Sequence, residues 1–284
     1  MVDEIIDRSE VLVEALPYIR QFSDKIVVIK YGGNAMEAHD LRESFAIDIV
    51  LLKYMGMRPV VVHGGGPQIG ETLKTLGKES EFVEGLRVTD DQTMEVVEMI
   101  LGGKVNGEIV GLINKAGGQG VGLTGSDGDM FKVERKVLGG RDIGRVGNVR
   151  QVNSGPVLAV ADSGYIPVVA PIGVDGDGIT HNINADEAAG ALACSLGAEK
   201  LVLLTDVEGV LDSGGNRISR LSVAKALALI DDGTADGGMI PKISCCVDAL
   251  SGGVKGAHII DGRLPHAILL EMLTDSGVGT LFFH

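Results

Sequence analysis

The sequence predicts an α/β fold with a mostly parallel central sheet and helices on both of its faces. Short, continuously apolar runs rich in β-branched residues recur along the 284 residues, and segments with the apolar spacing of helices separate them. Such runs are typical of strands buried on both faces, and their alternation with helices favours a parallel sheet. Glycine, at 42 residues, gathers at the ends of these runs, where tight turns and close approaches to a ligand are built. We therefore expect an αβα sandwich of two lobes that share one sheet.

The expected elements follow this pattern in chain order. The strands are expected at residues 25–31, 58–63, 166–171, 200–206, 256–261 and 279–283. The helices are expected over residues 41–52, 93–113, 185–196, 221–230 and 241–250. Glycines also separate two strand-like segments within residues 130–153, which predicts a hairpin. This hairpin is either a lid or a plain surface hairpin.

Domain boundaries rest on weak signals, because no Pro- or Ser-rich linker divides the chain. The Gly- and Asp-rich stretch 172–178 follows a predicted strand, and we place the boundary there. The expected parts are an N-terminal helical arm at 1–22, a first lobe at 23–173 and a second lobe at 174–284.

The N-terminal arm has a helical apolar stripe of its own. The stripe is made by Ile5, Leu12, Leu16 and Ile19. Pro17 would kink this helix, because proline cannot continue an α-helix without distortion. The arm packs either on its own domain or on another subunit, and the sequence leaves both interpretations open.

Composition and charge exclude several classes of protein. Hydrophobic residues make up 45% and charged residues 23% of the chain, which excludes a disordered protein. The 25 basic and 39 acidic residues give a net charge of −14 without a dense basic run, so we expect neither nucleic acid nor a membrane as partner. The acidic start of the chain, and apolar runs that stay well short of ~20 residues, predict a cytoplasmic protein. The three cysteines have neither a disulfide pattern nor the spacing of metal ligands.

Two glycine-rich turns follow the first two predicted strands. One is Lys30-Tyr-Gly-Gly-Asn34, and the other is His63-Gly-Gly-Gly-Pro67, whose proline is suited to open a helix. Helix N-termini bind anions through free backbone N–H groups. A single turn of this kind is more simply explained by packing. Two of them at one sheet edge favour a ligand-binding site.

Standard nucleotide-binding signatures are absent or incomplete. Gly77-Lys78 and Gly103-Lys104 are not followed by Ser or Thr, so the chain has no P-loop. A G-x-G-x-x-G pattern occurs at 120–125, but a strand pattern follows it where a dinucleotide-binding fold requires a helix. We therefore do not expect a nucleotide at that pattern.

Three further segments are polar where a plain α/β core would be apolar. Arg87 precedes a predicted helix for which Thr89 is a candidate N-cap, and its guanidinium is suited to grip a carboxylate. Asn182 and Asp186 lie around the start of another helix. Lys242 lies at the start of a third, where the helix dipole opposes a positive charge, and this local cost indicates a functional role.

Together, these segments resemble the amino-acid kinase family and, within it, the branch that acts on N-acetyl-L-glutamate. The motifs are KYGGNAM at 30–36, VVHGGGPQIG at 61–70, GLRVTD at 85–90, NINADEAAGALA at 182–193, LLTDVEGVL at 203–211 and GGMIPKI at 237–243. They occur in the family's order over about three quarters of the chain. Any one of them is weak evidence, whereas six in order make the resemblance specific.

The resemblance implies a reaction and the residues that carry it. The γ-phosphoryl group of MgATP would pass to the side-chain carboxylate of N-acetyl-L-glutamate, a step of arginine biosynthesis. Lys30 and Lys242 would flank the moving phosphoryl group, and Asp186 would hold both ammonium groups. The first lobe would bind acetylglutamate through Gly65, Gly66, Arg87 and Asn182. The second lobe would bind ATP with Thr205, Asp206 and Gly209, together with Gly32 and Gly33 of the first turn.

This chemistry needs positive charge and alignment more than it needs a base. A carboxylate acceptor is already deprotonated near neutral pH, so the barrier is largely the approach of two anions. Mg²⁺ would be held mainly by ATP phosphate oxygens, since it seldom needs a protein cage. The net charge of −14 does not contradict the assignment, because exposed charges beyond a Debye length of about 8 Å are largely screened.

A second resemblance concerns regulation. Arginine-inhibited members of this branch carry a kinked N-terminal helix that links dimers into a hexamer, and a C-terminal pattern of His, Glu and Gly. The arm and the residues His258, Glu271 and Gly277 match this description, and Tyr18 is a candidate contact to the same arginine. The resemblance thus implies arginine as inhibitor and a homo-oligomer, either a dimer or a hexamer. The alternative is that His258 is an ordinary strand residue and Glu271 a surface acid.

Two rival functions remain open. Family members that phosphorylate N-acetyl-aminoadipate, aspartate or UMP would share the lysines and glycine turns. A pocket distinguishes one methylene by only about 1–3 kcal/mol, so the longer acetyl-aminoadipate is a possible second substrate. The other rival is a non-catalytic sensor of arginine or nucleotide. The presence of Lys30, Lys242 and Asp186 argues against a sensor, which has no use for charges aimed at a phosphoryl group.

Overall fold

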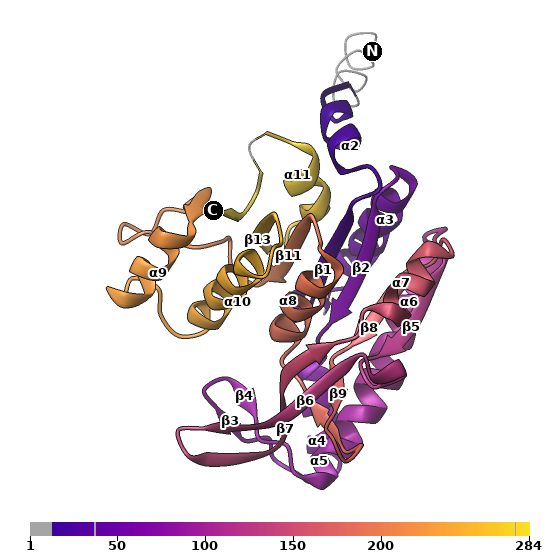
Figure 1. Cartoon of the computed structure of the whole chain (residues 1–284), viewed down its shortest axis with the longest axis vertical. Coiled ribbons are helices and arrows are strands. Elements are labelled where there is room, and N and C mark those ends of the chain that lie inside the picture. Colours follow the sequence, from indigo (N-terminus) through magenta and orange to yellow (C-terminus); the bar gives the residue numbers. More distant parts are fainter. Residues whose placement is uncertain (1–12, 37, 276) are drawn as a thin grey trace.

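One large sheet forms the centre of the computed structural model, which describes residues 13–36, 38–275 and 277–284 (Figure 1). Its strands lie in the order β12-β14-β13-β11-β1-β2-β8-β5. They are β1 (Ile26–Tyr31), β2 (Arg58–His63), β5 (Gly120–Thr124), β8 (Ile166–Ala170), β11 (Lys200–Thr205), β12 (Arg220–Ser222), β13 (Gly256–Asp261) and β14 (Thr280–Phe283). Neighbouring strands of this order are parallel except β13 and β14, which are antiparallel. The mostly parallel sheet predicted from the sequence is confirmed.

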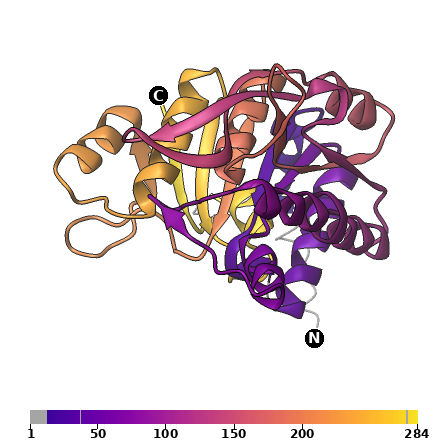
Figure 2. The ribbon, with the colours of Figure 1, turned by 90° about the horizontal axis from the view of Figure 1, so that it is seen from below.

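Helices cover both faces of this sheet, because each central strand is apolar on both sides. Val27 and Ile29 of β1 pack into one buried cluster, and Val28 packs into the other. The first cluster includes residues of α3 (His39–Tyr54), α4 (Gly66–Thr75), α5 (Asp91–Val97), the π-helix η2 (Glu98–Val105), α6 (Asn106–Lys115) and α11 (Ala267–Leu273). The second includes residues of α7 (Gly155–Asp162), α8 (Ala185–Leu196), α9 (Val223–Asp231) and α10 (Met239–Ser251). Figure 2 shows the two helical layers on either side of the strands.

A smaller β-structure lies below the main sheet in Figure 1. It closes as β10-β7-β6-β9 and consists of β6 (Phe131–Leu138), β7 (Arg141–Val152), β9 (Ile172–Val174) and β10 (Thr180–Asn182). The antiparallel pair β6–β7 is the predicted hairpin, which is confirmed. A second, short hairpin of β3 (Phe82–Val83) and β4 (Leu86–Arg87) lies near it. The proposed lobe boundary at 172–178 falls on β9 and the turn that follows.

The N-terminal arm is described only in part. Residues 1–12, with Ile5 and Leu12 of the expected stripe, lie outside the described residues. Val13 and Glu14 are helical, Ala15 lies in a turn, and α2 (Leu16–Phe22) follows with Pro17 in its first turn. A proline is tolerated in a first turn, because its missing N–H would have no helical partner there. The turn at Ala15 lies two residues before Pro17, and the predicted kink stays a prediction. No helix in the described parts of the chain combines the length and apolar character needed to cross a membrane.

Candidate active site

An aspartate paired with two lysines lies at the centre of the site. Asp186 is in the first turn of α8, and its Oδ1 lies 2.9 Å from Nζ of Lys30, at the carboxyl end of β1. Its Oδ2 lies 3.1 Å from Nζ of Lys242, in the first turn of α10. Three segments far apart in sequence thus bring two positive charges and one negative charge to one point. Two lysines around one aspartate leave the cluster with one formal positive charge in excess.

The electrostatics keep this carboxylate ionised. Burial alone would raise the pKa of Asp186, but the charges of Lys30 and Lys242 outweigh it and lower the pKa to about 2. The side chain of Asp186 is only 11% exposed. A buried carboxylate without these partners would be costly, so each member of the cluster depends on the others.

Local structure fixes the backbone of Asp186. The side chain of Asn184 is the N-cap of α8 and accepts hydrogen bonds from the N–H groups of Asp186 and Glu187, at 2.9 and 3.2 Å. On the other side, Sγ of Cys245 donates to the carbonyl oxygen of Asp186, at 3.1 Å. Asn184 was not singled out from the sequence. The signal that could have identified it is an Asn directly before a helix-forming segment.

The two glycine turns meet at the same edge of the sheet. β1 and β2 are in parallel register with Tyr31 opposite His63, and the N–H of Gly64 donates to the carbonyl oxygen of Tyr31 at 2.8 Å. A Cβ atom on Gly32 would lie 2.9 Å from Nζ of Lys30, so a bare backbone is needed there to leave the ammonium group its place. The predicted proximity of the two turns is therefore observed.

A cavity of about 190 Å³ brings together the residues expected to bind acetylglutamate. Gly65, Gly66, Arg87 and Asn182 all line it. One Nη of Arg87 donates to the carbonyl oxygen of Gly66 at 2.9 Å, the other donates to Ser80, and the guanidinium lies over the ring of Phe82. These contacts hold Arg87, which is 8% exposed as a residue, against the wall of the cavity. Nδ2 of Asn182 donates to Oγ1 of Thr89 at 3.3 Å.

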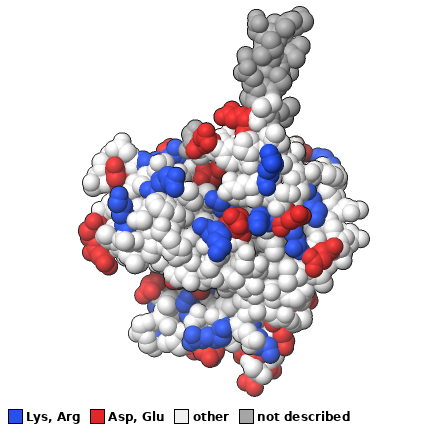
Figure 3. Space-filling view, turned by 45° about the horizontal axis from the view of Figure 1, so that its top comes forward, with Lys and Arg blue, Asp and Glu red and all other residues white. Residues whose placement is uncertain are grey.

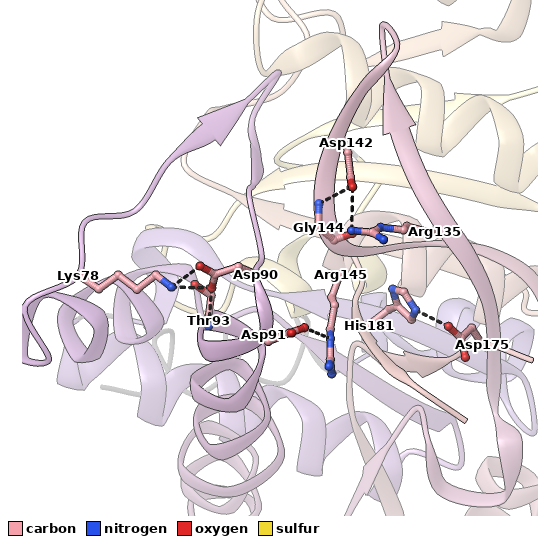
Figure 4. A network of polar contacts seen from close by, with 10 residues as sticks. All are labelled: Lys78, Asp90, Asp91, Thr93, Arg135, Asp142, Gly144, Arg145, Asp175 and His181. Atoms are coloured by element: carbon pink, nitrogen blue, oxygen red, sulfur yellow. Dashed lines mark hydrogen bonds and ion pairs between the residues drawn. The ribbon is translucent and has the colours of Figure 1, made fainter. Parts of the chain in front are cut away.

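Thr89 is not the N-cap of the following helix, contrary to the sequence-based expectation. The cap of α5 is Asp90, whose Oδ1 accepts from the N–H of Thr93 at 2.8 Å and whose carboxylate also pairs with Lys78 (Figure 4). Thr89 is fully buried and its hydroxyl donates to the carbonyl oxygen of Arg87. Both Thr and Asp are good N-cap residues. Asp90 is exposed, so its side chain can turn back to the helix, whereas the hydroxyl of the buried Thr89 is hydrogen-bonded to Arg87.

The hairpin β6–β7 is tied to the start of α5. Nε of Arg145 lies 2.6 Å from Oδ1 of Asp91 (Figure 4). Gly144 also forms an isolated β-bridge with Thr89. Nζ of Lys136, also on the hairpin, lies 2.6 Å from Oε1 of Glu187, the residue after the central aspartate. These contacts place the hairpin beside the site.

A second cavity, of about 830 Å³, adjoins Lys242. Asp206 and Gly209, two residues expected to bind ATP, line it. Thr205, Gly32 and Gly33 are not among its lining residues. Thr205 is buried and its hydroxyl exchanges hydrogen bonds with the backbone of Val207, which shapes the turn after β11.

Sequence reasoning missed several residues of this second cavity. They are Thr234, Asp236, Gly238, Met239 and Arg263. Arg263 pairs with Asp261 at 2.8 Å. The signal for Arg263 was available, since it follows the carboxyl end of a buried parallel strand.

A third cavity, of about 500 Å³, contains the four residues expected to bind arginine. Tyr18, His258, Glu271 and Gly277 all line it, together with Lys200, Arg220 and Asp275. Glu271 is not a surface acid, because its side chain is only 5% exposed. Its carboxylate lies 2.6 Å from Nδ1 of His258 and accepts from the N–H groups of Val278 and Gly279, at 2.7 and 2.9 Å. Tyr18 donates to Asp275, which joins α2 to this cavity.

The molecular surface carries mixed charge. On the face shown in Figure 3, Lys and Arg side chains alternate with Asp and Glu side chains. In the described residues, no group of three or more His, Cys, Asp or Glu side chains is arranged to hold a metal ion.

The fold and the site together define a phosphotransferase of the amino acid kinase family, to which the chain belongs. The sequence pattern of that family matches residues 25–261. A relative named acetylglutamate kinase, from Syntrophobacter fumaroxidans, is 58% identical, and the match covers 97% of this chain and 96% of the relative.

Solved structures of a second enzyme are also similar. The N-acetylglutamate synthase of Neisseria gonorrhoeae, in complex with coenzyme A and N-acetyl-glutamate, has a TM-score of 0.88 and 28% identity. The same enzyme with coenzyme A and L-arginine has a TM-score of 0.83 and 27% identity. Both matches cover 97% of this chain, which spans only 63% and 65% of the two synthase chains.

Proposed function

We propose that this protein transfers the γ-phosphoryl group of MgATP to the side-chain carboxylate of N-acetyl-L-glutamate, giving N-acetyl-L-glutamyl 5-phosphate and ADP. The observation that carries the proposal is the position of Asp186, which holds Lys30 and Lys242 at 2.9 and 3.1 Å. Lys242 lines the larger cavity, and Ala185, the neighbour of Asp186, lines the smaller one. The relative that is 58% identical over nearly its whole length is named for this activity. The reaction belongs to arginine biosynthesis.

Positive charge and alignment are what these residues supply. Two anions must approach each other, and fixed ammonium groups lower the cost of that approach more effectively in a partly buried site than in water. Lys30, at the glycine turns, faces the attacking carboxylate, and Lys242, beside the larger cavity, faces the ADP side. Asp186 keeps both ammonium groups in place before substrates arrive, so little reorganisation is needed at the moment of reaction.

The smaller cavity accommodates acetylglutamate. Arg87, held against Gly66 and the ring of Phe82, pairs with the α-carboxylate through its planar fork of N–H groups. Gly65 and Gly66 offer backbone N–H groups at the start of α4, and Asn182 offers its side-chain amide.

The larger cavity accommodates the nucleotide. Asp206 and Gly209 line it, and Thr205 shapes the turn that carries them. Gly32 and Gly33 do not line this cavity; their proposed role is to meet the phosphates from the first glycine turn, beside Lys30. Mg²⁺ supplies charge neutralisation on the phosphates when it is bound with ATP. The residues around Lys242 fit an ion held by phosphate oxygens, because the central carboxylate of Asp186 is already taken by two lysines.

A coupled assay tests this function. The purified protein is incubated with MgATP, acetylglutamate and hydroxylamine, which traps an acyl phosphate as a hydroxamate, while ADP release is followed in parallel. Hydroxamate and ADP should appear in equal amounts and only when acetylglutamate is present. Parallel reactions with N-acetyl-aminoadipate, aspartate and UMP test the rival substrates. Absence of product with acetylglutamate, or a higher kcat/KM for a rival, would overturn the proposal.

Arginine is proposed as a feedback inhibitor that binds the third cavity. This cavity presents acids to a guanidinium, through Glu271 and Asp275, and cations to a carboxylate, through Lys200 and Arg220. The similar synthase was solved with L-arginine bound. Arginine should lower turnover in wild type and act much more weakly on Glu271→Gln, with citrulline as the control ligand. Equal inhibition of the two proteins would contradict this assignment.

A homo-oligomer is proposed as the working form. α3 exposes an apolar stripe of Ile47, Leu51 and Tyr54, at 47%, 36% and 75%, and Leu16 of α2 is 50% exposed. We assign the dimer contact to α3 and the assembly of dimers into a hexamer to the N-terminal arm. Light scattering should give a hexamer for the full chain and a dimer after deletion of residues 1–22. An unchanged mass would exclude the arm from assembly.

A further inference from the structure

A fully buried histidine stands directly behind the second glycine turn. His63 is the last residue of β2, and its Nδ1 lies 2.8 Å from the carbonyl oxygen of Gly64. A carbonyl oxygen can only accept a hydrogen bond, so Nδ1 carries the hydrogen. The imidazole therefore donates to the peptide that joins Gly64 to Gly65.

The other ring nitrogen is held by an asparagine amide. Nδ2 of Asn106 lies 3.1 Å from Nε2 of His63 and also donates to the carbonyl oxygens of Val168, at 2.9 Å, and Leu123, at 3.3 Å. The contact with Val168 fixes which end of the amide is NH₂. Nε2 is therefore the acceptor, which agrees with Nδ1 as the donor. Burial lowers the pKa of His63 to about 4, so the ring is neutral near pH 7.

The same helical segment also contacts the turn itself. Asn106 directly follows the π-helix η2, whose Leu101 would lie only 2.5 Å from a Cβ atom on Gly65. π-helical segments are rare and occur frequently at functional sites. Here η2 requires a glycine at 65, and Asn106, the first residue of the following α6, carries the amide that orients His63.

The orientation of one peptide plane follows from these contacts. The peptide bonds in the described residues are trans, so the N–H of Gly65 points opposite to the carbonyl of Gly64. That carbonyl points at the buried imidazole. The N–H of Gly65 consequently points away from the imidazole. Gly65 also lines the smaller cavity, together with Gly64 and Gly66.

We propose that His63 and Asn106 are positioning residues that fix the Gly64–Gly65 peptide so that the Gly65 N–H, at the acetylglutamate cavity, donates to the phosphoryl group as it reaches the acceptor carboxylate. This inference rests on the proposed function for the identity of the anion. Neither side chain touches substrate. A donor aimed in advance stabilises developing charge without reorganisation, and its misalignment lowers kcat more than it raises KM.

A matched pair of variants tests the proposal. His63→Asn places an amide nitrogen near the position of Nδ1 and keeps the donor to Gly64, whereas His63→Gln places it near Nε2 and loses that donor. Since loss of one such donor costs about 10²-fold to 10³-fold in kcat, we expect a loss of about tenfold or more for His63→Gln. His63→Asn should retain most of the wild-type kcat, and KM for MgATP should change little in either variant.

The outcomes separate positioning from a merely structural role. Both substitutions bury an amide in place of the ring, so a structural role would affect the two variants alike. Equal kcat values in the two variants would overturn the proposal. Wild type in the same assay tests the proposed function separately. If wild type does not phosphorylate acetylglutamate, the proposed activity is wrong, and that result says nothing about the hydrogen bonds of His63.

The tautomer of His63 can also be measured by NMR on the wild-type protein, without an activity assay and without any variant. The ¹⁵N resonances of the His63 imidazole distinguish its two neutral tautomers. The Nδ1–H form is expected near pH 7. An Nε2–H form would remove the donor to Gly64 and overturn the proposal, whatever the variants do.

Discussion

Nζ of Lys242 lies 3.1 Å from Oδ2 of Asp186, and this ion pair joins the first turns of α10 and α8. A positive charge at a helix N-terminus is opposed by the helix dipole, so the position of Lys242 reduces the stability of α10 by a few tenths of a kcal/mol or more. The carboxylate of Asp186 offsets that cost. It also holds the ammonium group close to that of Lys30. Holding two positive charges together does not favour folding, but it does favour the transfer of an anion.

The first prediction concerns the two lysines. Lys30→Met and Lys242→Met should each lower kcat by about 10²-fold or more, because each removes a fixed charge that acts on the transition state. The measurement is steady-state hydroxamate formation at saturating substrates. Lys115→Met is the matched control, since the side chain of Lys115 is 70% exposed and lies on the surface beside Glu43. Turnover within a few-fold of wild type for either site variant would remove that lysine from the mechanism.

Much of the fold could be predicted from the sequence, because burial on both faces leaves a direct mark on a strand. The apolar runs at 25–31 and 200–206 correspond to the neighbouring central strands β1 and β11. β5 was missed because its glycines hide the apolar pattern. One of them, Gly122, has no room for a side chain, because a Cβ atom there would lie 2.0 Å from the amide oxygen of Asn106.

The site was predictable to a different degree. Resemblance named Lys30, Asp186 and Lys242, but no periodicity places residues 156 and 56 positions apart in contact. The choice between Thr89 and Asp90 as helix cap could not be made from sequence, because both are good caps and only burial separates them. The role of His63 was missed because a histidine at a strand end is usually a packed core residue.

The second prediction concerns acid unfolding. The pKa of Asp186 is about 2 in the folded protein and 3.8 ordinarily, so the folded state gains stability above pH 3.8 that is lost as the pH falls toward 2. At about 1.4 kcal/mol per pKa unit, the contribution is roughly 2 kcal/mol. Urea unfolding of wild type should therefore show a steeper loss of free energy below pH 4 than Asp186→Asn does. Parallel curves for the two proteins would contradict it.

The third prediction concerns the buried imidazole. The pKa of His63 is lowered by burial from 6.5 to about 4. Between pH 6.5 and 4 the imidazole is therefore protonated in the unfolded chain but stays neutral in the folded protein. Stability is therefore full above pH 6.5 and falls as the pH drops to 4, by about 3 kcal/mol in total. His63→Asn removes this titration. Its free energy of unfolding should fall less than that of wild type between pH 6.5 and 4, and an identical fall would show that the imidazole is not buried neutral.

The fourth prediction concerns the cap of the helix that carries the central aspartate. Asn184→Ala leaves the N–H groups of Asp186 and Glu187 without their side-chain acceptor, which should lower the free energy of unfolding by about 1 kcal/mol. Ser154→Ala is the matched control, because Ser154 is the N-cap of α7 but its side chain makes no capping hydrogen bond. The control should lose less than half as much in urea unfolding at pH 7. Equal losses at the two caps would mean that the Asn184 hydrogen bonds are replaced by water at little cost, and would leave the backbone of Asp186 held by its ion pairs alone.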